Sequence, residues 1–228
     1  MTTKRLCTVF VLIAGILTVL VLAGGLVLSG RSGKSKQECE AYLETTYGEV
    51  FDDTIALGGR EGDGYAVTSE RFPDGDLTVK RNEDGTMSSN YMAYVYEADT
   101  RRWIENCARA AWDDVKVIYT PTANVLPSDI TPDVPLSHFL CEATSDISAI
   151  LFVTDDGFFT KDEALEVFRA ACEDNGVCLR GEIRIVEDVA NVDAETIGDD
   201  TCSFMLNEDF TFQHASWASE GSDSNEKK

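Results

Sequence analysis

The hydrophobic pattern of the chain begins with an unbroken apolar run from Leu6 to Leu28, which contains no charged side chain. As a helix this run would be about 34 Å long, at about 1.5 Å per residue. That exceeds the roughly 30 Å hydrocarbon core of a bilayer. Residues 6–28 are therefore predicted to be a transmembrane helix. A cleaved signal peptide is the alternative, although its apolar region is normally only about 7–15 residues long.

After this run the apolar positions recur with helical and strand periods, which predict an α+β fold. We expect an antiparallel or mixed sheet with two to three helices. Residues 48–64 are rich in glycine and aspartate and are predicted to be a loop or a frayed helix end. The turn at 72–75 should join two strands as a hairpin. The predicted helices cover 37–47, 100–112 and 160–172, and the predicted strands cover 65–71, 76–82, 90–96, 115–119, 148–154, 179–187, 202–206 and 209–212.

Residues 120–135 hold four of the five prolines and are predicted to be a connection between two halves, 37–120 and 136–214. Proline removes a backbone donor and disfavours helix before it. The halves are candidates for two similar βαβ-containing units, because the same residue recurs sixty positions later at five places. Chance similarity of two alanine-rich helices is the alternative. Residues 215–228 are rich in serine and glutamate and are predicted to be a disordered tail. The recurring positions are Thr100, Arg109, Ala110, Ala111 and Asp114, repeated at Thr160, Arg169, Ala170, Ala171 and Asp174.

Charge divides the chain into two parts. The whole chain has 41 acidic and 19 basic side chains and a net charge of −22. Residues 1–36 carry five basic side chains and no acidic one, so residues 37–228 carry −27. So acidic a domain is not expected to bind nucleic acid, which is held mainly by Lys and Arg. Basic proteins or divalent cations are the expected partners, and segment 29–36 is expected to lie against lipid headgroups.

Six cysteines follow the apolar run, and an even number suggests disulfides in an oxidising compartment. This favours a short cytoplasmic N-terminus, residues 1–5, with the acidic domain 37–214 outside the cell. A bridge between Cys172 and Cys178 is the most local pairing, because Asn175 and Gly176 form a turn dipeptide between them. Reduced, buried cysteines in a cytoplasmic domain are the alternative. The candidate disulfide residues are Cys39, Cys107, Cys141, Cys172, Cys178 and Cys202.

The segment 152–163 has a partial likeness to a calcium-binding loop. Gly157 and Glu163 have the spacing of positions six and twelve of an EF-hand, and Asp156 would occupy position five. Two main ligands are missing, because Phe152 and Thr154 stand at positions one and three, where the loop normally has Asp or Asn. A capping box formed by the side chains of Thr160 and Glu163 explains the same residues and is the favoured interpretation. Calcium is thus the candidate cofactor, with Asp156 and Glu163 as its candidate ligands.

No catalytic constellation is evident in the sequence, and no residue is predicted to be catalytic. The expected function is that of a single-pass, membrane-anchored extracytoplasmic binding or accessory protein of the cell envelope. Two alternatives stay open: a hydrolase whose site is assembled from distant residues, and an immunity-type partner within an envelope complex. The tyrosines at 91, 94 and 96 could form a binding face, although a place in the core is favoured.

Overall fold

The computed structural model describes residues 36–57, 64–143, 147–155, 157–176 and 178–219. The predicted transmembrane helix 6–28, the predicted cytoplasmic residues 1–5 and the basic residues 29–35 lie outside these ranges. Within them, no helix is both long enough and apolar enough to cross a bilayer.

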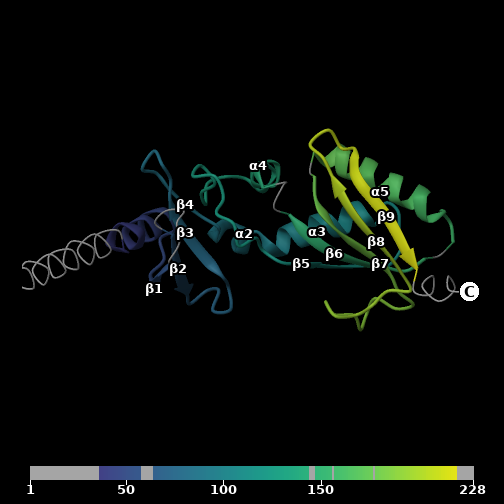
Figure 1. The fold of residues 1–228 in the computed structure, drawn as a ribbon, viewed down its shortest axis with the longest axis horizontal. Coiled ribbons are helices and arrows are strands. Elements are labelled where there is room, and N and C mark those ends of the chain that lie inside the picture. The colour runs from purple at the N-terminus through teal and green to yellow at the C-terminus, as the bar shows by residue number, and fades with distance from the viewer. Residues whose placement is uncertain (1–35, 58–63, 144–146, 156, 177, 220–228) are drawn as a thin grey trace, which may run out of the picture.

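The first part of the fold is a four-stranded antiparallel sheet with strands in chain order (Figure 1). The helix over residues 36–47 packs against it through Cys39 and Leu43, both fully buried. The predicted hairpin is confirmed, because β2 and β3 pair across the turn at 72–75. The strands are β1 (Phe51–Leu57), β2 (Gly64–Ser69), β3 (Leu77–Arg81) and β4 (Met87–Ser89).

The second part is a five-stranded mixed sheet, also with strands in chain order. β6 and β7 run parallel, joined through α5, and every other neighbouring pair is antiparallel. The mixed α+β architecture is therefore confirmed. The strands are β5 (Val115–Tyr119), β6 (Ser148–Val153), β7 (Arg180–Ile185), β8 (Asp200–Leu206) and β9 (Phe212–Ser219), and the main helices are α3 (Glu97–Ala108) and α5 (Lys161–Asn175).

Helices α3 and α5 cover one face of the five-stranded sheet (Figure 1). Alternate residues of the strands point toward them, as in β5, where Val115, Val117 and Tyr119 are buried. Phe168 of α5 lies at the centre of this core, with its ring 5.6 Å from that of Phe204 in β8. Burial of such aromatic side chains contributes the main favourable free energy of folding here.

A junction of two short helices and an irregular segment lies between the sheets (Figure 1). The helices are α2 (Tyr91–Val95) and α4 (Leu136–Glu142). Residues 120–135 form an irregular proline-rich connection, which joins β5 to α4 and not one sheet to the other. The buried side chains of Leu126 and Ile130 hold this connection against the core. The Tyr96 hydroxyl also donates a hydrogen bond to the Val134 carbonyl, which ties the connection to the start of α3.

Three local predictions were wrong. Residues 51–57 form β1 rather than a loop, because β2 supplies a pairing partner that local composition does not reveal. The strand predicted over 90–96 is mostly α2: Tyr91, Met92 and Ala93 are all buried, which a strand with one buried face would not allow. Residues 215–219 belong to β9, paired with β8, and not to the predicted tail 215–228. The remaining tail, 220–228, lies outside the described residues.

The two sheets do not coincide with the expected halves 37–120 and 136–214. Strand β5, in the first of these halves, pairs with β6 in the second. The recurring residues also occupy different structural positions. Thr100 is buried within α3, whereas Thr160 is the exposed N-cap of α5. Likewise Arg109 follows the end of α3, whereas Arg169 lies inside α5. Among the described residues only the second half contains a βαβ unit, so the similarity reflects composition rather than a repeated structure.

Candidate functional site

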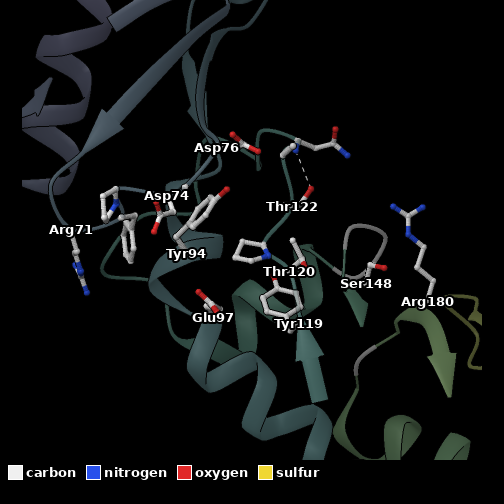
Figure 2. A pocket seen from close by; sticks show the side chains of 16 residues that line it. Arg71, Asp74, Asp76, Tyr94, Glu97, Tyr119, Thr120, Thr122, Ser148 and Arg180 are labelled. Carbon is white, nitrogen blue, oxygen red and sulfur yellow. Dashed lines mark hydrogen bonds between the residues drawn. The ribbon is translucent and has the colours of Figure 1, made fainter. Parts of the chain in front are cut away.

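The candidate site is an open cleft of about 810 Å³ at the junction between the sheets (Figure 2). Its walls come from the β2–β3 turn, from α2 and the first residue of α3, and from the segment that follows β5. The first residues of β6 and β7, Ser148 and Arg180, close its far side. Because these elements are distant in sequence, the cleft exists only in the folded chain.

The Tyr94 ring forms one wall of the cleft and packs directly on the β2–β3 turn. A Cβ atom at Gly75 would come within 2.9 Å of the Tyr94 ring, so this contact requires glycine. The ring of Phe72, on the same turn, lies 5.7 Å from that of Tyr94. Burial, followed by the negative charges of Asp76 and Glu97, raises the pKa of the Tyr94 hydroxyl. The hydroxyl is therefore a neutral group at physiological pH.

Asn90 holds three segments around the cleft in place through its fully buried side chain. Its Oδ1 accepts a hydrogen bond of 2.8 Å from the Thr78 backbone amide in β3. Its Nδ2 donates to the Asp76 carbonyl at 2.9 Å and to the Thr122 carbonyl at 2.8 Å. Asn90 thereby joins β3, the β2–β3 turn and the proline-rich connection, and it also ends the short strand β4.

Three carboxylates lie around Tyr94, those of Asp74, Asp76 and Glu97 (Figure 2). Within the described part of the chain, no salt bridge involves any of the three. The two arginines of the cleft lie at opposite ends of it (Figure 2). Arg71 is bound to Glu49 at 3.1 Å, so its charge is already partly compensated. The centre of the cleft is consequently acidic.

This arrangement is suited to binding a cationic group. Carboxylates attract an ammonium or guanidinium group, and an adjacent tyrosine face can contribute a cation–π contact. No histidine, cysteine or lysine is found among the described residues that line the cleft. Elsewhere, His138 lies 3.7 Å from the Asp129 carboxylate at an exposed site.

Glu163, one of the two candidate calcium ligands, is used to cap α5. Its Oε2 accepts hydrogen bonds from the Thr160 backbone amide at 2.9 Å and from the Thr160 hydroxyl at 2.8 Å. The Thr160 hydroxyl in turn accepts from the Glu163 amide, so the predicted capping box is confirmed. Asp156 lies outside the described residues. Among those that are described, no group of three or more His, Cys, Asp or Glu side chains is arranged to hold a metal ion.

The six candidate disulfide residues carry thiols in this structure, and no disulfide joins any two of them. Cys172 and Cys178 are not bridged, because α5 continues past Cys172 to Asn175 and directs the Cys172 side chain into the core. Burial raises the pKa of the Cys39 thiol and of the Cys202 thiol, each to about 11. These two thiols are therefore protonated and poor nucleophiles.

Sequence reasoning found neither the cleft nor its organising residue. Asp74 and Asp76 lie in the β2–β3 turn and Glu97 begins α3, so the three carboxylates meet only after folding. Tyr91 is in the core, as favoured, while Tyr94 faces the cleft. The one local signal for Asn90 is its residue type, since Asn commonly replaces backbone hydrogen bonds at the end of a strand.

Comparison with known proteins adds no family, since no family model, curated protein or solved structure significantly matches this chain.

Proposed function

We propose that this chain is a single-pass, membrane-anchored binding or accessory protein of the cell envelope, whose outer acidic domain binds a basic protein partner in the cleft at the junction. The observation that carries the proposal is the group of three carboxylates around Tyr94, which form no salt bridge with any residue that the structure describes. A lysine or arginine side chain of the partner would supply the missing positive charge.

The net charge of the domain supports the same partner class. Residues 37–228 carry −27, and a field of that sign attracts a basic protein and accelerates its association. The apolar run 6–28 supports the anchor, and the cysteine number supports the outer location. An acidic domain of this kind would be repelled by anionic lipid, which would leave the cleft accessible to a partner.

The test measures binding of a fluorescent hexa-arginine peptide to the full chain in neutral detergent micelles. The triple variant Asp74→Asn, Asp76→Asn, Glu97→Gln should bind the peptide about tenfold more weakly at an ionic strength of about 0.1 M, which corresponds to about 1.4 kcal/mol. A loss of that size is expected because three charge-assisted contacts are removed from one partly enclosed site.

The matched control makes the same change of charge away from the cleft, at three exposed carboxylates whose side chains form no hydrogen bond with the described residues. We expect the control variant, Asp113→Asn, Glu142→Gln, Asp174→Asn, to bind within about twofold of the unmodified chain, because charges beyond a Debye length of about 10 Å are screened. Equal weakening by both variants would show that the peptide senses only the overall charge and would refute the cleft as the binding site.

A further inference from the structure

Strand β9 forms one edge of the five-stranded sheet, and the structure describes no strand beyond it (Figure 1). Its eight residues make it the longest strand that the structure describes. On the face opposite α3 and α5, the side chains of His214, Ser216 and Ala218 are exposed. Half of the backbone N–H and C=O groups of an edge strand point away from the sheet, where a strand of another chain can bind them.

Each of the other sheet edges has a feature that hinders such pairing, as is usual in proteins. Strand β1 contains two adjacent aspartates and a register irregularity. Strand β4 has only three residues, and the Leu126 amide donates to its Ser89 carbonyl at 3.0 Å. Strand β5 contains Lys116, and the Arg109 guanidinium donates to the Val115 carbonyl at 3.5 Å. In contrast, β9 contains no Asp, Glu, Lys, Arg or Pro, so its edge is unprotected.

The charge pattern favours a second copy of this chain as the occupant of this edge. Residues 37–228 carry −27, and a net charge of that size normally keeps copies of a protein apart. The repulsion is weakest at β9, because residues 201–206 of the neighbouring β8 also contain no Asp, Glu, Lys or Arg. The one carboxylate of β8, that of Asp200, forms a salt bridge with Lys161. A basic partner would find no acidic side chain along this edge to bind.

The segment that follows β9 in the sequence is a poor occupant of the same edge. Residues 220–228 contain no β-branched and no aromatic residue, which are the residue types that strands favour. A second β9 has both the length and the composition of a strand, and every copy of the chain supplies one.

We propose that β9 pairs antiparallel with β9 of a second copy, about a twofold axis at Ser216. The pairing of β9 with β8 is regular from His214 to Ser219, after a register shift, and Ser216 lies near the middle of this regular part. The two five-stranded sheets would thereby join into one sheet of ten strands. The axis reverses the direction of β9, so the two copies point in opposite directions along it. This pairing is independent of the proposed function.

The side chains of β9 are complementary to themselves in this register. Residues opposite one another in an antiparallel pair lie on the same face of the sheet. His214 of one copy therefore lies opposite Ala218 of the other, and Trp217 lies opposite Ala215. Each large side chain meets a small one, and no like charges are placed opposite each other, which would destabilise the pair.

The dimer should be weak, and salt should strengthen it. One pair of strands buries much less than the roughly 1,600 Å² of a standard interface, so we expect a dissociation constant of roughly 10–100 µM. This constant should fall about threefold between about 0.01 M and 0.15 M NaCl, because salt screens the repulsion between the two acidic domains. Salt weakens the binding of a basic peptide in the cleft, so the two interactions are distinguished by the sign of their salt dependence.

Sedimentation equilibrium of the full chain in density-matched neutral detergent measures the dissociation constant. We expect Ser216→Lys to raise it about tenfold, because two like charges then lie opposite each other at the axis. The matched control, Ser137→Lys, makes the same change of charge at an exposed serine of α4 and should leave the constant within about twofold. Self-association that Ser216→Lys leaves unchanged would show that the chains associate elsewhere, as through the apolar run 6–28, and would overturn the proposal.

A mixture of two variants tests the register and excludes misfolding as the cause of any loss. Ser216→Glu should also weaken self-association. An equimolar mixture of the Ser216→Lys and Ser216→Glu chains should pair at least as tightly as the unmodified chain, since opposite charges then meet at the axis. A mixture that stays monomeric would overturn the pairing. So would an unmodified chain that stays monomeric at about 300 µM in 0.15 M NaCl, well above the expected dissociation constant, whether residues 220–228 or another protein occupies the edge.

Discussion

A single buried side chain, that of Asn90, determines how the walls of the cleft are held. It satisfies one backbone amide and two backbone carbonyls from segments that have no common sheet pairing. A buried polar group left without a partner costs about 1–3 kcal/mol. At this position one asparagine therefore replaces the hydrogen bonds that a continuous strand would have provided.

Replacement of this residue should affect both stability and binding. We expect Asn90→Ala to lower the free energy of unfolding by about 2–4 kcal/mol, because three buried backbone groups lose their partner. Urea denaturation followed by tryptophan fluorescence measures the change. Binding of hexa-arginine should also weaken, since the β2–β3 turn that carries Asp74 and Asp76 is no longer fixed. The control Asn191→Ala, at an exposed asparagine, should change the free energy of unfolding by no more than about 0.5 kcal/mol. A similar loss of stability in both variants would contradict the role given to Asn90.

At the scale of elements, several turns are closed by an aspartate that binds a threonine just after it. The Asp209 carboxylate accepts from the Thr211 hydroxyl at 2.6 Å and from its amide at 3.1 Å, and Asp84 binds Thr86 in the same way. These hydrogen bonds, the hydroxyl first, lower the pKa of both carboxyls. They favour the ionised form in the folded state, as they would in any Asx turn.

The lowered pKa gives a pH dependence with a definite sign. The folded chain binds protons on Asp84 and Asp209 less readily than the unfolded chain, in which the pKa of an aspartate is about 3.9. The stability that these turns contribute is therefore fully present above that pH and is lost as the pH falls through the lower, folded pKa. Thr211→Val should raise the pKa of Asp209 toward its ordinary value, as followed by carbon NMR of the carboxyl group. Thr86→Val should do so for Asp84 alone; an unchanged Asp209 in the Thr211→Val chain would contradict the assignment.

Elements that depend on short-range signals were predictable, and those that depend on distant partners were not. Helix α5 and its cap follow from Thr160 and Glu163, three residues apart, and the β2–β3 hairpin follows from its turn residues. In contrast, α2 depends on burial of Tyr91 beneath Tyr47 and Phe72, which come from elsewhere in the chain. The cleft was missed for the same reason, because its carboxylates converge only after folding.

For the molecule as a whole, the excess of negative charge opposes the compact state. Residues 37–228 carry −27, and folding brings these charges closer together. The described salt bridges are mostly exposed, as in the pair formed by Arg102 and Asp99, and compensate only a small part of this repulsion. The folded domain must therefore depend on its apolar core and on screening by salt.

Added salt should raise the thermal stability of the chain. We expect Tm in detergent micelles to rise most between about 0.01 M and 0.15 M NaCl, over which the Debye length falls from about 30 Å to about 8 Å, and to level off above that range. Differential scanning calorimetry measures Tm at each salt concentration. A Tm that is flat or falls over this range would show that repulsion among the carboxylates does not limit stability.

The two sheets follow one another along the longest axis of the molecule, with the helix over 36–47 at one end and α5 and β9 at the other (Figure 1). Any tension between these ends must pass through the junction, where the chain crosses from β4 through α2 into α3. The hydrogen bonds of Asn90 lie on that path and also set the width of the cleft. Stretching the molecule and reshaping its cleft are therefore one and the same deformation.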